Sequence, residues 1–260
     1  MAAIQTSVVS QVPREIDAVE WDLRVQLAAC YRIVDYFDWC ELIYGHISLR
    51  VPGPEHHFLI NPYGLRYDEM TASSLVKIDL DGNLVEPSDY PFNPAGFVIH
   101  SAIHQHRENA HCVIHTHTRA GMAVAALECG LLNISMNATS FYNNIGYHDY
   151  EGSQLFLDER RKLAEDLGTS NVMILRNHGL LSVGATVPEA FLHIYRLERA
   201  CQVQLDAMAC RQKLVIPSDS VVARSADQMD DFAKCAADLG QLEFDALVRL
   251  MDQRDPSFRN

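Results

Sequence analysis

The strongest constraint on the fold is the repeated change in the spacing of apolar residues along the chain. In three short runs, at 47–51, 58–60 and 76–80, apolar residues alternate with others, which is the period of a half-buried β-strand. At 23–38 and 191–208 they recur every three or four positions, which is the period of an amphipathic helix. Repeated switching between the two periods predicts an α/β domain.

The remaining elements are predicted from apolar runs, glycines and capping residues. We expect helices at 95–106, 120–127, 158–167 and 232–251, and further strands at 111–117 and 172–175. Asn61-Pro62-Tyr63-Gly64 and Asp81-Gly82 are turn sequences between the early strands. Thr186-Val187-Pro188-Glu189 has the form of a capping box, so the helix that includes 191–208 should begin there.

Size, charge and cysteine content narrow the class of protein. A chain of 260 residues that is 48% hydrophobic can build one large core, so we expect a single domain with its core at about 21–210 and a C-terminal helical extension at 222–260. The formal net charge of −13, without any basic cluster, argues against nucleic-acid and membrane binding. Residues 1–19 lack the pattern of a signal peptide, and the seven cysteines show no CxxC spacing. These features are typical of a cytoplasmic protein with reduced thiols.

Histidines are concentrated in one segment, because six of the twelve lie between residues 100 and 117. His115 and His117 are two positions apart on a predicted strand, so both imidazoles should point to the same face and could bind one metal ion. By itself this HxH spacing is a weak indication. His178 follows the strand of 172–175 and precedes a turn-permitting glycine, which makes it the best third ligand. Considered alone, it could equally be a histidine bonded to a backbone carbonyl.

A second pair, His100 and His104, is spaced i, i+4 on the predicted helix of 95–106. This spacing is also compatible with a metal site, but no flanking glutamate or third partner accompanies it. We therefore interpret the pair as a solvated helix face or as outer support for the first site.

Five motifs occur in order along the chain: Tyr44-Gly45-His46-Ile47-Ser48, Ile60-Asn61-Pro62-Tyr63-Gly64, Asn93-Pro94-Ala95-Gly96, Val113-Ile114-His115-Thr116-His117 and Ile174-Leu175-Arg176-Asn177-His178-Gly179-Leu180. Together they resemble the class II aldolase/adducin family over about 21–208. The resemblance implies a three-layer α/β/α sandwich around a mixed, largely antiparallel central sheet. It also implies a homo-oligomer, commonly a tetramer, that acts on a small-molecule substrate.

The resemblance further implies one divalent metal ion, usually zinc with manganese and iron as alternatives, held by His115, His117 and His178. In the aldolases such an ion acts as a Lewis acid that stabilises the enediolate formed when a bond next to a carbonyl breaks. The family's fourth ligand, a carboxylate, would fall at Gly96 in this chain. A proton carrier must therefore come from elsewhere, and the candidates are His100, Tyr142, Tyr147, His148 and metal-bound water.

The substrate side of the site also departs from the aldolases. The predicted substrate contacts are His46, Asn61 and Gly96, and few small hydroxyl donors stand at the phosphate-loop positions, which argues against a sugar phosphate. Ala95-Gly96 and the segments 147–152 and 198–202 are closest to the adducin-like branch of the family.

Three functions follow from these features. The first is a metal-dependent lyase that acts on a small hydroxy or keto acid, or on a sugar-derived carbonyl compound, by aldol cleavage or decarboxylation. The second is a non-haem iron oxygenase or isomerase with three histidine ligands. The third is a non-catalytic, adducin-like interaction module.

Overall fold

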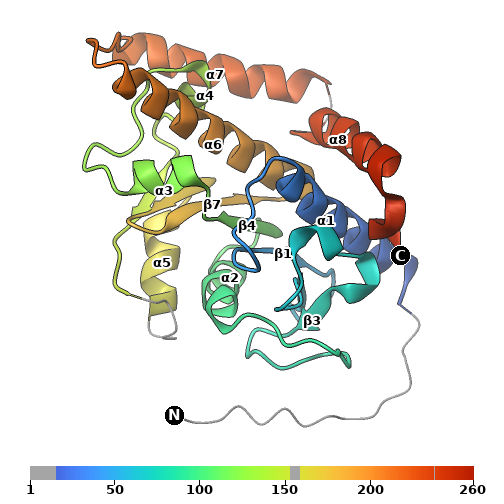
Figure 1. Ribbon diagram of the computed structural model, residues 1–260. Helices are drawn as coiled ribbons and strands as arrows, with labels where there is room; N and C mark the ends of the chain where they lie inside the picture. The colour runs from blue at the N-terminus through green and yellow to red at the C-terminus, as the bar shows by residue number, and fades with distance from the viewer. Residues whose placement is uncertain (1–15, 153–158, 237) are drawn as a thin grey trace.

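A computed structural model describes residues 16–152, 159–236 and 238–260 of the chain. These residues form three layers, in which helices cover both faces of a central sheet (Figure 1). The strands are β1 (His46–Arg50), β2 (Phe58–Ile60), β3 (Val76–Ile78), β4 (Cys112–Thr116), β5 (Gly146–His148), β6 (Val172–Leu175) and β7 (Gly179–Gly184). The α-helices are α1 (Ala18–Tyr36), α2 (Pro94–His106), α3 (Arg119–Ala125), α4 (Met136–Thr139), α5 (Glu159–Leu167), α6 (Val187–Ala209), α7 (Asp219–Ala236) and α8 (Gln241–Arg254). Short 3₁₀ helices, η1 to η3, occupy Tyr67–Glu69, Ala72–Ser74 and Pro256–Arg259.

The strand order is β3-β2-β1-β4-β7-β6-β5. All neighbouring strands are antiparallel except β5 and β6, which are parallel. The expected three-layer sandwich with a mixed, largely antiparallel sheet is therefore confirmed. In the register of β1 against β4, His46 lies directly opposite His115, so their side chains are neighbours on one face of the sheet.

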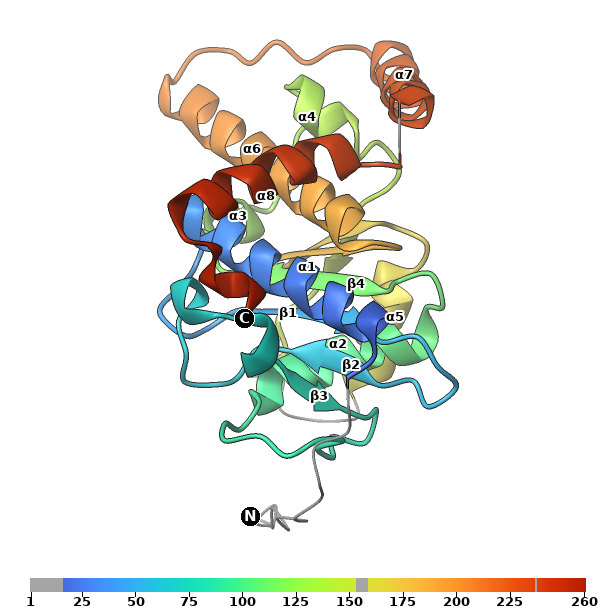
Figure 2. The ribbon, with the colours of Figure 1, turned by 90° about the vertical axis from the view of Figure 1, so that its right-hand side faces the viewer.

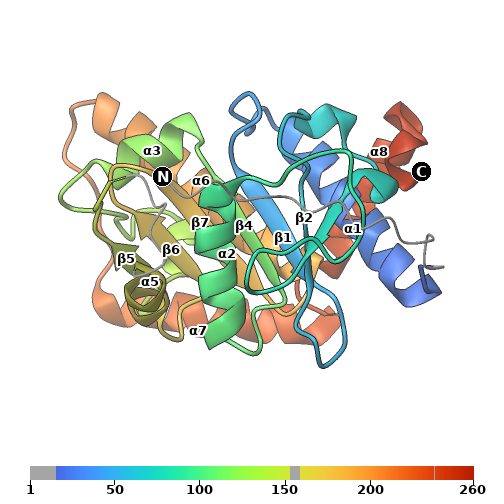
Figure 3. The same cartoon turned by 90° about the horizontal axis from the view of Figure 1, so that it is seen from below.

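The alternation of side chains decides which residues face which helices. Helices α2 and α5 cover one face of the sheet, and α1, α3 and α6 cover the other (Figures 1 and 3). In β4, Ile114 packs into the core beneath α1 and α6, whereas Val113 packs with Ile103 of α2. Because side chains two residues apart share a face, His115 lies on the α2 side with Val113. The candidate ligands therefore lie on the α2 side of the sheet.

The C-terminal segment adds to the main core. Helix α8 lies across α1 and α6 (Figure 2), where Phe244 and Met251 are buried. The prediction of one helix from 232 to 251 is wrong, because α7 ends at Ala236 and α8 begins only at Gln241. Gly240, immediately before α8, has a φ of +82°, and a Cβ atom there would lie 2.3 Å from the Pro188 carbonyl oxygen. Both the backbone conformation and this close approach require glycine.

The other predicted elements agree within a few residues, but strands β5 and β7, helix α4 and the first part of α7 were not predicted. Neither β5 nor β7 was expected, and every residue of β7 is buried, so its sequence shows no alternation. The predicted start of α5, Asp158, lies outside the described residues. Thr186 caps α6 as expected, but the Glu189 carboxylate accepts from the Ala185 N–H rather than closing the capping box. None of the described helices is long and apolar enough to cross a membrane.

Candidate metal centre

Three imidazoles converge between the end of β4 and the β6–β7 turn. Nε2 of His117 lies 2.8 Å from Nε2 of His115 and 2.9 Å from Nε2 of His178. The ligand atoms of all three lie within 4.8 Å of one another, the only such group of three or more candidate ligands in the described part of the chain. The same-face arrangement predicted for the HxH pair is present, and His178 supplies the third nitrogen.

A tight hairpin places His178. Leu175 pairs with Gly179, so Arg176, Asn177 and His178 form a three-residue turn between β6 and β7. Asn177 has a φ of 55°, in the left-handed region that asparagine tolerates in such turns. The turn therefore depends on Asn177 and not, as the sequence suggested, on the glycine behind His178.

Gly179 has a different function, which is to let the hairpin approach β4. A Cβ atom at this position would lie 2.4 Å from the Thr116 carbonyl oxygen and 3.2 Å from the His117 ring. No side chain fits in that space. The absence of a side chain at Gly179 thus allows His178 to come within reach of the other two imidazoles.

Hydrogen bonds at the far side of two rings fix their protonation. The His115 Nδ1–H donates to the Leu180 carbonyl (2.9 Å), and the His117 Nδ1–H donates to Glu41 Oε2 (2.7 Å). A neutral imidazole carries one N–H, so each Nε2 is left with a lone pair that points into the cluster. Lone pairs 2.8 Å apart repel, and a cation between them converts that repulsion into coordination. The donor set therefore fits a divalent ion such as zinc, with coordination positions left open.

Burial favours the neutral form of His115 and His178. Desolvation lowers the pKa of His115 well below its usual value, and the neighbouring His178 and His117 lower it further. The pKa of His178 is lowered to about 4, mainly by burial. Metal ligands must be deprotonated, so both imidazoles are ready to coordinate near neutral pH.

His46 and Gly96 lie together beside the triad. The His46 ring is 4.9 Å from that of His115, centroid to centroid. A Cβ atom on Gly96 would lie 2.6 Å from Cδ2 of His46. The space that a side chain at position 96 would need is thus occupied by the His46 imidazole. The substrate contacts predicted for both residues stay predictions.

The interpretation of His100 and His104 as a solvated helix face is wrong, whereas outer support for the first site stays a prediction. The two residues are 0% and 3% exposed, because α2 turns them onto the sheet. His100 Nε2 lies 2.7 Å from His46 Nδ1, and Ser48 Oγ bridges His100 Nδ1 and His104 Nε2. His104 Nδ1 in turn lies 3.0 Å from the Ala110 carbonyl oxygen. His100 therefore supports His46 from behind, and both of its ring nitrogens are engaged.

The other predicted acid–base residues are held by neighbours of their own. The Tyr147 hydroxyl accepts from the Leu131 N–H (3.0 Å). His148 is buried, and its Nδ1–H donates to the Asp166 carboxylate (2.7 Å), while its Nε2 atom has no partner within the described residues. Tyr142 is half-buried. A catalytic role for Tyr147 or His148 stays a prediction.

Asn61 lies in the core. It is 0% exposed, and its side-chain oxygen accepts from the Tyr31 hydroxyl (3.0 Å). Its backbone N–H donates to the same hydroxyl. This arrangement ties the end of β2 to α1. The substrate contact predicted for Asn61 stays a prediction.

Two groups of the site were missed in the sequence. Glu41, which orients His117, is 76 positions away from it and belongs to no motif. Ser48 falls inside a recognised motif, but only the packing of α2 on β1 reveals that it joins two histidines.

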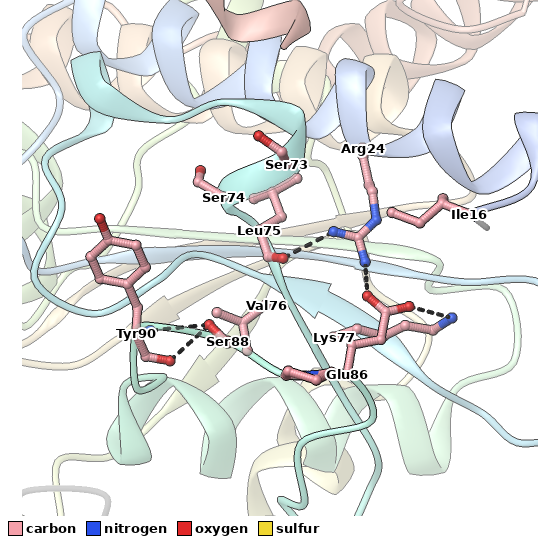
Figure 4. A pocket seen from close by; sticks show the side chains of 11 residues that line it. Ile16, Arg24, Ser73, Ser74, Leu75, Val76, Lys77, Glu86, Ser88 and Tyr90 are labelled. Atoms are coloured by element: carbon pink, nitrogen blue, oxygen red, sulfur yellow. Dashed lines mark hydrogen bonds and ion pairs between the residues drawn. The ribbon is translucent and has the colours of Figure 1, made fainter. Parts of the chain in front are cut away.

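A separate pocket beside α1 and β3 contains none of these residues (Figure 4). Its two cationic side chains are paired, Arg24 with Glu86 (2.7 Å) and Lys77 with Glu20 (2.6 Å). Arg24 also donates to the Leu75 carbonyl. These cations hold the N-terminal part of the fold together, and the candidate centre stays at the three histidines.

Comparison with known proteins gives consistent matches. The family profile of the class II aldolase and adducin N-terminal domain matches residues 25–205. A candidate class 2 aldolase of Pseudomonas aeruginosa is 43% identical, over 97% of this chain and 98% of that protein. Alpha-adducin of Rattus norvegicus is 40% identical over 97% of this chain, which spans only 37% of that protein. The solved structure of L-fuculose 1-phosphate aldolase from Glaciozyma antarctica superposes with a TM-score of 0.81 at 26% identity, covering 96% of this chain and 97% of that one.

Proposed function

The chain belongs to the class II aldolase and adducin family, and on that basis we propose that it is a metal-dependent lyase. The ion is held by the Nε2 atoms of His115, His117 and His178. The observation that carries this proposal is the convergence of three imidazole nitrogens, with two of the rings oriented by hydrogen bonds to Leu180 and Glu41. Zinc is the proposed ion, with manganese and iron as alternatives.

The proposed substrate is a small hydroxy or keto acid, or a related carbonyl compound, that undergoes aldol cleavage or decarboxylation. A bound divalent ion would stabilise the negative charge that develops next to the breaking bond. The protein ligands are all neutral here, because His46 fills the space beside Gly96 where the family places a carboxylate. A site that leaves the charge of its ion uncompensated favours an anionic, chelating substrate. Phosphorylated sugars, by contrast, are named for solved structures that are 16–26% identical to this chain.

An open pocket lies against the hairpin turn that carries His178. It is lined by Arg176 and Asn177 of that turn and by Asp149 and Tyr150 after β5, and none of the three histidines lines it. We further propose a cytoplasmic homo-oligomer, a tetramer, that binds neither nucleic acid nor membranes.

A second candidate function is an adducin-like interaction module. The 40% identity to alpha-adducin, over nearly the whole of this chain, favours it. The two functions differ in one measurable respect, because a module of this kind has no turnover to lose when the ligands are removed.

The test is turnover by tag-free protein, either loaded with zinc, manganese or iron(II) or stripped with a chelator. A panel of hydroxy and keto acids, with phosphorylated and unphosphorylated sugars, is assayed for aldehyde and carbon dioxide release and for oxygen uptake. We expect metal-dependent cleavage of a carboxylate-bearing carbonyl compound, lost in His117→Ala and kept in His106→Ala, whose imidazole bonds only within its own helix. Oxygen uptake would instead support the iron enzyme. Inactivity of every loaded form on the whole panel would favour the interaction module.

A further inference from the structure

Behind the three candidate ligands, His46, His100, Ser48 and His104 form a buried chain of hydrogen bonds. The hydrogen bond at the His104 end determines which atom donates in each of the others. The Ala110 carbonyl oxygen can only accept, so His104 Nδ1 carries the proton of that hydrogen bond. Burial lowers the pKa of His104 to about 3, so the ring is neutral and its Nε2 is a bare acceptor. The Ser48 hydroxyl, 2.7 Å away, must therefore donate its single proton to His104.

The proton positions of the next residues toward the three ligands follow in the same way. With its proton already used, the Ser48 oxygen can only accept, so His100 Nδ1–H donates to it. His100 is fully buried, and desolvation lowers its pKa well below the usual value. Its Nε2 is then bare and accepts from His46 Nδ1–H at 2.7 Å. Because His46 Nδ1 carries the N–H of this hydrogen bond, the other nitrogen of the neutral ring, Nε2, keeps its lone pair.

That Nε2 atom forms no hydrogen bond within the described residues. It is not among their fully buried unpartnered atoms, although His46 as a whole is only 3% exposed. His46 lies opposite His115 in the β1–β4 register, and the centroids of the two rings are 4.9 Å apart. Gly96 leaves room for the ring, since a Cβ atom there would lie 3.1 Å from this Nε2.

We propose that His100, Ser48 and His104 act as positioning residues that lock His46 in its Nδ1–H tautomer. Its bare Nε2 then supplies, beside the three ligands, the acceptor that Gly96 cannot provide. The lone pair of His46 Nε2 would accept a hydrogen bond from a hydroxyl of the substrate or from a bound water. This role deepens the proposed function, and only this role rests on it. The tautomer itself is a property of the protein alone.

The hydrogen-bonded chain from His104 to His46 orients His46 but cannot conduct protons. A proton entering at His46 would move along the chain to His104, whose other nitrogen is bonded to a carbonyl that cannot pass it on. The resulting imidazolium would be buried near Arg50, which already disfavours the charged form of His104. The chain therefore ends in a fixed donor, which is what a tautomer lock requires.

The test removes His104, which lies at the far end of the hydrogen-bonded chain and forms no hydrogen bond to His46 itself. In His104→Phe the Ser48 hydroxyl is free to donate to His100 instead, so the whole chain can reverse and leave the proton on His46 Nε2. Ser48→Ala interrupts the chain at its middle and serves as the second variant. Ser101→Ala is the matched control, because this buried serine, next to His100, donates within the described residues only to carbonyls of its own helix.

The readout is ¹⁵N NMR of histidine-labelled protein, in which protonated and bare ring nitrogens have distinct shifts, measured with and without zinc on samples that retain a cooperative thermal transition. We expect one His46 tautomer, Nδ1–H, in the wild type and in Ser101→Ala, and a mixture with the Nε2–H form in His104→Phe or Ser48→Ala. Turnover should fall about 10- to 100-fold with the mixture. A wild-type proton on Nε2, or wild-type tautomer ratios in the folded chain variants, would overturn the proposal. Because the metal-free spectrum suffices, a failure of the lyase assignment is recognised separately.

Discussion

Gly179→Ala gives the sharpest quantitative test of how the hairpin and β4 form the site. The added Cβ atom would lie 2.4 Å from the Thr116 carbonyl oxygen, whereas ordinary contact begins at 3.4 Å, so about 1 Å must be gained by movement of backbone (3.4 − 2.4). Overpacking of this kind costs roughly 1–3 kcal/mol of stability. The movement that relieves it separates β7 from β4 and carries His178 away from His117.

We therefore expect two effects of Gly179→Ala. The free energy of unfolding of the metal-free protein falls by roughly 1–3 kcal/mol. The zinc dissociation constant rises about 10- to 100-fold, which is the effect usually seen when the support of a ligand is disturbed. That rise corresponds to about 1.4–2.8 kcal/mol of binding free energy. Urea denaturation measures the first quantity and competition with a chromophoric chelator the second.

The matched control is Gly184→Ala at the opposite end of β7. A Cβ atom there would lie 2.5 Å from the Ala190 backbone nitrogen, so a similar loss of stability is expected. That clash is against α6 and not against the histidines, and zinc affinity should be unchanged. If Gly179→Ala binds zinc as the wild type does, or if both variants lose affinity equally, the reasoning about close approach is refuted.

Three further predictions concern single interactions. Glu41→Ala removes the acceptor of His117 Nδ1–H and should weaken zinc binding about tenfold, measured by chelator competition; unchanged affinity would show that Glu41 does not orient the ring. The folded-state pKa of His104 lies at about 3 against an ordinary 6.5, so unfolding takes up a proton below about pH 6.5 and stability falls as the pH is lowered. In His104→Phe the slope of unfolding free energy against pH should drop by up to about 1.4 kcal/mol per pH unit, and an unaltered slope would contradict the assignment. Tyr147→Phe removes the acceptor of the Leu131 N–H and should lower the free energy of unfolding by about 1–3 kcal/mol by urea denaturation.

Elements with a strong local period were predictable from the sequence, and elements defined by distant contacts were not. The helix at 95–106 and the strand at 172–175 carry apolar patterns of their own, and both are present. β7 is buried on both faces and shows no alternation. The break between α7 and α8 depends on the approach of Gly240 to Pro188, 52 positions away (240 − 188), which no local pattern reveals.

Some residues of the candidate site could likewise be predicted from local sequence patterns, and others could not. His115 and His117 could be paired because the predicted strand of 111–117 places both on one face, although β4 itself ends at Thr116. His178 could be added because it follows an apolar strand, although the turn proved to depend on Asn177. The burial of His100 and His104 could not be predicted, because helical spacing says that two side chains share a face and not what covers that face.

The metal content of the protein tests the central claim most directly. Tag-free wild type, His117→Ala and His106→Ala are each dialysed against zinc and then against metal-free buffer, and the bound zinc per chain is measured by mass spectrometry. A three-ligand centre predicts one ion per chain in the wild type and in His106→Ala, and a large loss in His117→Ala, because each imidazole also fixes the geometry of the other two. Equal zinc content in His117→Ala and the wild type, or no bound zinc in the wild type, would contradict the assignment of His115, His117 and His178 as the metal site.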